Sequence, residues 1–252
     1  MREVLQWVEA MDFKQSPPVT AQRVQRRLRE ITGINDPYLS AKARQNQIAI
    51  ELLPTLRAKI RASEQPLMIA ARIAIAGNMI DMGPNGNVTE EDVRQAILQA
   101  LSAPFWGEQD LFLQAVAQAR SILYLADNAG EIACDRLLIE QLPMERVTLA
   151  VRGAPVLNDA TRADAQAVGL EEMVEVIDNG SDAPGTILDD CSQEFQQRFA
   201  EADLIIAKGQ GNFETLSNQS GNIFFLFKVK CPLVAERILQ PVGTQVLVHG
   251  QW

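Results

Sequence analysis

Apolar residues recur at helical spacing from Met1 to about Phe105, while Gly and Pro gather between the apolar segments. This pattern predicts that the first part of the chain is all helix. One helix is expected to start at Asp36-Pro37, because Asp is a favoured N-cap and Pro a favoured first helical residue. The expected helices cover residues 19–32, 36–62 and 67–80, followed by the loop DMGPNGN and a fourth helix that opens at Thr89.

After about Gly107 the pattern changes to short β-branched and apolar runs that alternate with helical stretches. Strands that alternate with helices predict an α/β domain whose mainly parallel sheet has right-handed crossovers and is covered on both faces. We divide the chain into a helical N-terminal domain, residues 1–106, and an α/β domain, residues 107–252. The predicted strands are Ser121–Ala126, Arg146–Val151, Met173–Ile177, Asp203–Ala207, Asn222–Phe227 and Gln245–Val248.

Charge and hydropathy then narrow the classes of partner. The 252 residues carry a net charge of −9, which disfavours nucleic acid and anionic membrane surfaces as partners. No apolar run approaches the roughly 20 residues that span a bilayer, and the first residues do not form a signal-peptide core. We therefore expect a cytoplasmic protein. The sequence leaves its oligomeric state open.

Cysteine and histidine usage excludes several catalytic classes. The three cysteines are widely spaced and odd in number, which favours buried thiols over a disulfide framework or a zinc cluster. The single histidine, His249, lies at a predicted strand end, where a structural role is expected. A Ser-His-Asp hydrolase, a His-rich zinc hydrolase or a histidine phosphatase would each need that one residue, so all three are disfavoured.

Polar residues follow five of the predicted strands, and the carboxyl ends of parallel strands share one edge of a sheet. Any single loop could hold only N-caps and turn residues. That interpretation does not explain why carboxylates, amides, glycines and lysines gather at the same end of every strand, so the contrast favours a site. The segments are Asp127 to Glu131, Asn158 to Thr161, Asn179 to Thr186, Lys208 to Glu214, and Lys228 to Pro232.

These residue types favour a hard cation beside a phosphate. Asp and Asn oxygens without nearby His or Cys suit Mg²⁺ or Mn²⁺, and Co²⁺ or Ni²⁺ can also bind such oxygen-rich sites. Lysines supply point charges for a phosphate, and the glycines of Lys208-Gly209-Gln210-Gly211 allow backbone N–H groups to approach an anion. This loop is not a Walker A sequence.

In combination, these motifs resemble the damage-control metal-dependent phosphatase family, formerly a domain of unknown function with protein-glutamate methyltransferase-like members. The resemblance is to its prokaryotic branch and covers nearly the whole chain. It is carried by Ala76 to Asp81, Asp127 to Glu131, Asn158 to Thr161, Ser181 to Gly185, Lys208 to Asn212, and Lys230. Prokaryotic relatives usually begin with an upstream helix that carries a Cys-x-x-Cys pair, which is not found in this sequence.

The resemblance implies a helical part packed on a Rossmann-like three-layer αβα domain. It places a divalent metal at Asp127, Asn128 and Asp159, with these residues also forming the catalytic set. Substrate contacts are implied for Asn78, Asp81, Gly209, Gly211, Asn212 and Lys230. The role of Glu131 stays open between orienting a metal-bound water and capping its own helix.

The leading hypothesis is hydrolysis of small phosphomonoesters, such as sugar phosphates or damaged phosphometabolites, by a metal-activated water. A covalent aspartyl route is a minor variant, because the Asp-x-Asp-x-Thr arrangement is absent. The alternative from another class is a non-catalytic, metal-dependent binding protein for a nucleotide or phosphorylated metabolite. A carboxyl methyltransferase is least favoured, because no convincing glycine-rich cofactor loop follows the first predicted strand. The sequence leaves the substrate and the physiological metal open.

Overall fold

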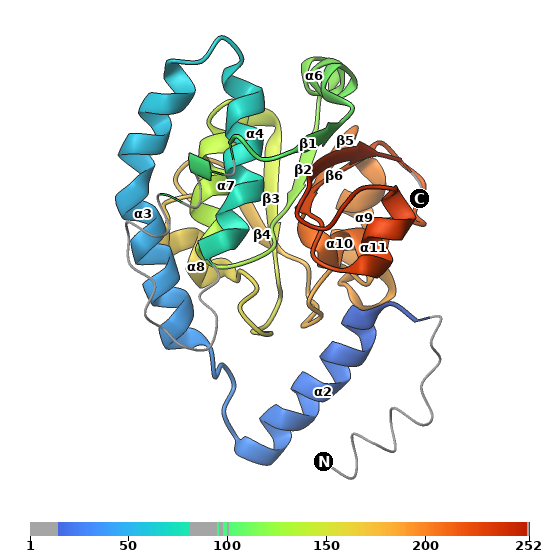
Figure 1. Ribbon diagram of the computed structural model, residues 1–252. Helices are drawn as coiled ribbons and strands as arrows, with labels where there is room; N and C mark the ends of the chain where they lie inside the picture. Colours follow the sequence, from blue (N-terminus) through green and yellow to red (C-terminus); the bar gives the residue numbers. More distant parts are fainter. Residues whose placement is uncertain (1–14, 81–94, 96–97, 100, 251) are drawn as a thin grey trace.

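The computed structural model describes residues 15–80, 95, 98–99, 101–250 and 252. An N-terminal set of helices leads into a three-layer α/β fold (Figure 1). The helices are α2 (Pro17–Thr32), α3 (Leu39–Arg61), α4 (Pro66–Ala76), α6 (Gln109–Gln118), α7 (Glu131–Ile139), α8 (Arg162–Ala167), α9 (Gln193–Glu201), α10 (Gly209–Leu216) and α11 (Pro232–Ile238). Short 3₁₀ turns are η1 (Gly77–Ile80), η2 (Met144–Arg146) and η3 (Leu188–Asp190).

One seven-stranded sheet has the order β1-β7-β6-β5-β2-β3-β4. Every pair is parallel except β6 with β7, so the predicted mainly parallel sheet is confirmed. The chain runs outward from β2 through β3 to β4, then returns to place β5 on the other side of β2. The strands are β1 (Phe105–Gly107), β2 (Ile122–Leu125), β3 (Val147–Val151), β4 (Glu175–Asp178), β5 (Leu204–Lys208), β6 (Ile223–Lys228) and β7 (Gln245–His249).

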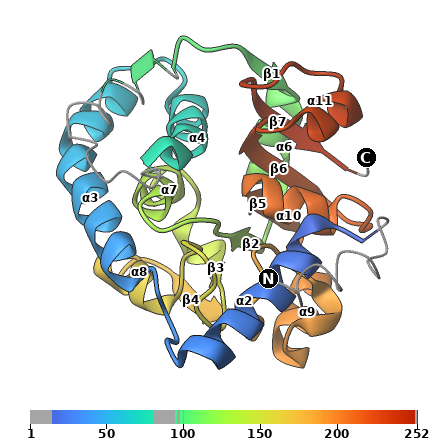
Figure 2. The same cartoon turned by 60° about the horizontal axis from the view of Figure 1, so that its bottom comes forward.

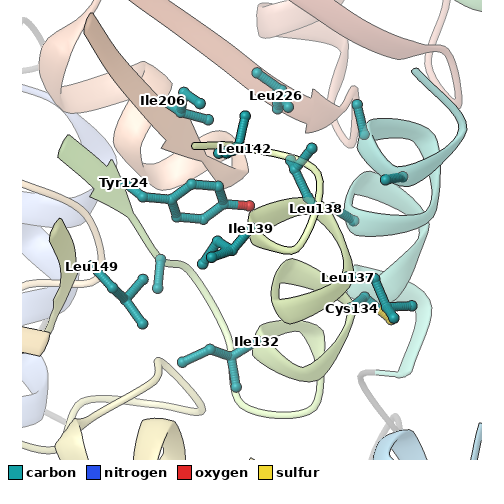
Figure 3. Close-up of a cluster of buried hydrophobic side chains, with 14 of the residues drawn as sticks. Tyr124, Ile132, Cys134, Leu137, Leu138, Ile139, Leu142, Leu149, Ile206 and Leu226 are labelled. Carbon is teal, nitrogen blue, oxygen red and sulfur yellow. The ribbon is translucent and has the colours of Figure 1, made fainter. Parts of the chain in front are cut away.

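Alternating side chains of the central strands fill two separate cores. Tyr124, Ile206 and Phe224 join the core beneath α3, α4 and α7, whereas Leu123 and Phe225 join the core beneath α9, α10 and α11. Figure 3 shows the first of these, with the Tyr124 ring extending from β2 toward α7. Because both faces are covered, the central strands are apolar almost throughout. The rigid sheet therefore fixes where its edge loops lie.

Several element boundaries differ from those predicted. Asp36 does not cap α3; its side chain accepts a hydrogen bond from the Tyr38 N–H at 2.9 Å, and the helix begins at Leu39. The third predicted strand is displaced, because Met173 and Val174 lie in a turn closed on the Leu170 carbonyl. The third helix turns from α to 3₁₀ at η1, and the short strand β1 was not predicted.

The loop DMGPNGN and the start of the fourth predicted helix lie outside the described residues. The proposed domain division between residues 106 and 107 stays a prediction, and β1 spans it. In the part of the chain that the structure describes, no helix combines the length and the apolar character needed to cross a membrane.

Candidate active site

The site lies where the strand order reverses, between β2 and β5. Ligands of open α/β sheets bind outside the carboxyl ends of the strands at such a switch point. Asp127 and Asn128 follow β2, and Gly209 follows β5. Gly209 has φ +81°, and a Cβ there would lie 2.0 Å from Asp127 Oδ2. The two loops are therefore packed closely enough to require glycine at this position.

Asp159 joins this group because β3 lies beside β2 in parallel. The two loops form their own backbone connection: Ala160 N donates to Asp127 O at 2.8 Å, and Ala129 N donates to Asn158 O at 2.8 Å. Asn128 and Asp159 form an isolated antiparallel bridge. The adjacency that a shared site for Asp127, Asn128 and Asp159 requires is thus present.

Each of these three side chains keeps one oxygen free of hydrogen bonds from the described residues. Asp127 Oδ2 accepts from Asn128 Nδ2 at 2.8 Å and Asn78 Nδ2 at 3.3 Å, and Asp159 Oδ2 accepts from Arg152 Nε at 2.7 Å. No hydrogen bond from the described residues reaches the Oδ1 atoms of Asp127, Asn128 and Asp159. Arg152 Nη2 lies 3.8 Å from Asp127 Oδ1. Amide and carboxylate oxygens of this kind are ligands for hard cations.

Negative charge is crowded at this point. Burial raises the pKa of Asp127 well above its usual value, and the charges of Glu131 and Asp159 raise it further. Burial also raises the pKa of Asp159, although Arg152 opposes the shift. An added cation would lower the energy of both carboxylates.

Arg152, the first residue after β3, places a positive charge beside Asp127 and Asp159. Its side chain is buried, with Nε on Asp159 and Nη1 3.5 Å from Thr186 Oγ1. Nη2 is buried, makes no hydrogen bond to the described residues and faces Asp127. A buried unsatisfied donor costs about 1–3 kcal/mol, so this group is available to an incoming acceptor.

Glu131 begins α7 but does not cap the helix with its side chain. Oε2 accepts from Asn78 Nδ2 at 2.7 Å, while Oε1 accepts from Lys208 Nζ at 2.7 Å. Lys208 also donates to Asp135 Oδ1 at 2.5 Å, and Tyr124 donates to the same oxygen at 2.8 Å. Glu131 thus accepts hydrogen bonds from the amides of Asn78 and Asn128 and does not cap its helix, while its role toward a metal-bound water stays a prediction.

Lys208 is fully buried below the sheet edge where the site loops lie. It does not face that edge, unlike the phosphate-binding lysines expected there. Its position follows from the strand period, because Lys208 shares the face of Leu204 and Ile206 and so points toward α7. Burial opposes its charge, but Asp135 and Glu131 hold the pKa of Lys208 above its usual value. Burial raises the pKa of Asp135 to about 6 despite Lys208.

The other predicted contact residues differ in exposure. Asn212 is buried, with Nδ2 donating to Lys208 O and Ala126 O and Oδ1 accepting from Thr186. At Gly211 a Cβ would lie 2.6 Å from Pro184 O. Lys230 is exposed, and its charge lowers the pKa of Asp127. Its backbone N donates to Gln210 Oε1 at 3.0 Å.

From the helical part, Asn78 reaches Asp127 and Glu131, whereas Asp81 lies outside the described residues. His249 lies at the other end of the sheet, paired with Phe224 near the start of β6 and 3.0 Å from Asn222 Oδ1. The described cysteines are free thiols.

Arg152 is the site residue that we did not predict from the sequence. Its signal was its place as the first residue past a buried strand, at the same sheet edge as Asp127. A buried arginine beside predicted carboxylates becomes conspicuous only once β3 is placed next to β2.

Residues 1–246 match the family described as the damage-control phosphatase ARMT1-like domain. A damage-control phosphatase of Archaeoglobus fulgidus is 36% identical over 231 residues, covering 90% of this chain and 80% of that protein. A damage-control phosphatase of Pyrococcus horikoshii is 34% identical over 242 residues, covering 94% and 82%. An uncharacterized protein of Methanocaldococcus jannaschii is 36% identical over 236 residues, covering 89% and 77%.

The fold is equally similar to a solved structure. The crystal structure of a DUF89 family protein from Pyrococcus horikoshii superposes with a TM-score of 0.88 at 30% identity, covering 99% of this chain and 88% of that one. The expected helical and Rossmann-like architecture is thereby confirmed. The names of two relatives support a phosphatase-type function. Through the match to residues 1–246, this chain belongs to the damage-control phosphatase ARMT1-like domain family.

Proposed function

We propose that the protein is a metal-dependent phosphatase that hydrolyses small phosphorylated metabolites at the β2/β5 switch point. The observation that carries the proposal is the convergence of Asp127, Asn128 and Asp159, each with one oxygen that accepts no hydrogen bond from the described residues. A phosphate-binding module would need the cationic groups but has less use for this oxygen set.

Asp127, Asn128 and Asp159 would hold a divalent cation through those oxygens. Among the described residues, no three His, Cys, Asp or Glu side chains form a metal cluster, so the proposed set depends on the amide as its third ligand. The chemistry of the donors favours Mg²⁺ or Mn²⁺, with Co²⁺ or Ni²⁺ as further candidates. The bound ion would supply Lewis acidity, stabilising charge on a phosphoryl oxygen and promoting attack by water.

The residues around these ligands have distinct roles in this proposal. Arg152 Nη2 donates to a phosphoryl oxygen, because it is a buried cationic donor beside Asp127 that makes no hydrogen bond to the described residues. Lys230, exposed in the loop between β6 and α11, adds a positive charge for the same anion. Asn212 acts indirectly, by tying the ends of β2 and β5 together through Ala126 O and Lys208 O.

The test is phosphate release from a panel of phosphorylated metabolites, with Mg²⁺, Mn²⁺, Co²⁺ and Ni²⁺ supplied in turn. We expect metal-dependent turnover in the wild type and a loss of at least about a hundredfold in Asp127→Asn, which removes the charge from a proposed ligand. Asp178→Asn is the matched control, since Asp178 lies exposed at the end of β4 on the same sheet edge. It should keep the wild-type rate.

Undiminished turnover in Asp127→Asn after chelation of the metal would refute the mechanism. Metal-dependent binding of a phosphorylated metabolite without turnover across the panel would instead favour the non-catalytic binding protein. Accumulation of a phospho-enzyme would favour the covalent aspartyl route.

A further inference from the structure

Helix α3 presents a run of buried polar side chains to the site loops. Lys42 and Asn46 are 1% and 3% exposed, and they lie on the same face of the helix because they are four residues apart. Both belong to the N-terminal helical part. Asn46 lies more than 80 residues away in sequence from its two partners, whereas Lys42 pairs with Asp164 at 2.9 Å and with the nearby Asp36 at 3.4 Å. Buried polar groups are costly unless they are fully paired, so their partners define what they do.

Asn46 uses both ends of its amide, and each end reaches a different loop of the site. Oδ1 accepts from Gly130 N at 2.7 Å, in the loop that carries Asp127 and Asn128. Nδ2 donates to Asp164 Oδ1 at 2.9 Å, on the helix that follows Asp159. The amide orientation follows from these partners, because a backbone N–H can only donate and an unprotonated carboxylate can only accept.

Asp164 in turn is hydrogen-bonded to the loop that carries Asp159. Its Oδ2 accepts from both the N–H and the hydroxyl of Thr161, at 2.8 Å each, in a capping box at the start of α8. Thr161 stands two residues after Asp159. Lys42 Nζ lies 2.9 Å from Asp164 Oδ2.

We propose that Asn46 and Lys42 of α3 are positioning residues, which fix the separation of the two loops that carry Asp127, Asn128 and Asp159. A cation binds only when ligands from both loops stand at the correct distance, and outer-shell partners of ligands typically change metal affinity 10- to 100-fold. Asn46 is the single side chain among the described residues whose hydrogen bonds join Gly130 to Asp164. The inference rests on the proposed metal site but concerns a different set of residues.

The test uses the full chain, with Mn²⁺ as the probe and no substrate. In Asn46→Leu, which keeps the volume but removes both hydrogen bonds, we expect the dissociation constant for Mn²⁺ to rise about 10- to 100-fold. Amide hydrogen exchange followed by NMR should accelerate at Gly130 and at Thr161 together. Gln47→Leu is the control, because Gln47 is exposed and donates to Glu51 on the same helix.

Asn46→Asp is the second variant. It keeps the proposed link between the two loops, called the brace below, testable if Asn46→Leu does not fold. It retains an acceptor for Gly130 N but places a carboxylate against Asp164. Exchange should therefore accelerate at Thr161 and not at Gly130, with weaker Mn²⁺ binding. Lys42→Arg, which keeps the charge near Asp164, should retain more Mn²⁺ affinity than Lys42→Met.

The outcomes separate this inference from the proposed function. Melting temperatures that fall while Mn²⁺ affinity and exchange at both loops stay at wild-type values would make Asn46 merely structural and overturn the brace. If wild-type protein binds no Mn²⁺, the proposed metal site fails. Exchange at Gly130 and Thr161 in Asn46→Leu then decides the positioning role by itself. Acceleration at both loops supports that role, and acceleration at one or neither overturns it.

Discussion

The buried side chain of Arg152 is held by hydrogen bonds on one part of its guanidinium and makes none on the other. Its Nε and Nη1 are directed to Asp159 and Thr186, whereas Nη2 makes no hydrogen bond within the described part of the chain. The planar guanidinium makes this division possible, since fixing one edge of the fork aims the remaining N–H groups. A lysine would be a point charge and could not serve both edges.

We predict that Arg152→Lys lowers the turnover of the phosphatase by about 10²–10³, the usual cost of losing one preorganised donor. The charge is kept, so the loss would report geometry. Steady-state phosphate release measures the effect, and thermal unfolding checks the fold. Arg162→Lys serves as control, because Arg162 is mostly exposed and its ion pair among the described residues is with Glu171. Turnover within about twofold of wild type in Arg152→Lys would contradict the role given to Nη2.

At the scale of elements, α2 is attached to the α/β part by charged groups. Figures 1 and 2 show α2 apart from α3, lying across the end of the molecule where the site loops gather. Gln22 and Arg26 donate to Asp182 at 2.8 and 2.6 Å, and Arg29 also pairs with Asp182. Burial opposes the ionisation of Asp182, but hydrogen bonds from Arg26 and Gln22 hold its pKa below the usual value.

This attachment should weaken in acid. A carboxylate whose folded-state pKa is depressed stabilises the fold above its unfolded pKa, about 3.9, and that contribution is lost as pH falls through the lower folded-state pKa. We predict that Asp182→Asn lowers the melting temperature at pH 7 and that the difference from wild type shrinks below about pH 4. Calorimetry of both proteins between pH 7 and pH 3 measures it.

Asp189→Asn is the control for this series. Asp189 is a neighbouring carboxylate in η3 that forms no hydrogen bond or ion pair with α2 among the described residues. Its difference from wild type should be small at pH 7. A difference for Asp182→Asn that stays constant down to pH 3 would show that its ionisation does not hold α2.

At the scale of the whole molecule, cation binding and folding should be coupled. The proposed ligands come from two loops, and those loops are braced by α3, so the complete site exists only in the folded chain. A ligand that binds only the native state stabilises it by about 2.7 kcal/mol at a hundred times its dissociation constant. For a chain of this size, that corresponds to a rise in melting temperature of roughly 5–10 °C.

We predict such a rise for wild-type protein with Mn²⁺, and none for Asp127→Asn at the same concentration. Differential scanning fluorimetry with and without chelator measures both. A rise of equal size in the two proteins would place the cation elsewhere. Asp178→Asn again controls for the loss of one negative charge at this edge of the sheet.

The fold was largely predictable because its signals are local. Strand and helix periods, together with Gly and Pro punctuation, identified six of the strands of the sheet within a few residues. The third strand was displaced because Met173 and Val174 satisfy a β pattern in sequence but close a turn on Leu170. The edge strand β1 has only three residues, Phe105–Gly107, which is too short for a period to register.

By itself, the sequence determined the βα order, the polar residues at the carboxyl ends of the strands, and the motifs that mark the family. Only the tertiary structure decided which side chains reach the site. Lys208 has the residue type of a phosphate ligand, but strand alternation points its side chain into the core, where it donates to Glu131 and Asp135. Arg152 and Asn46 have ordinary local settings, and their contacts with the site loops follow only from the placement of β3 and α3 in the folded chain. The physical reason is that periodicity records the face on which a side chain lies, whereas its pairing depends on which loops the sheet brings together.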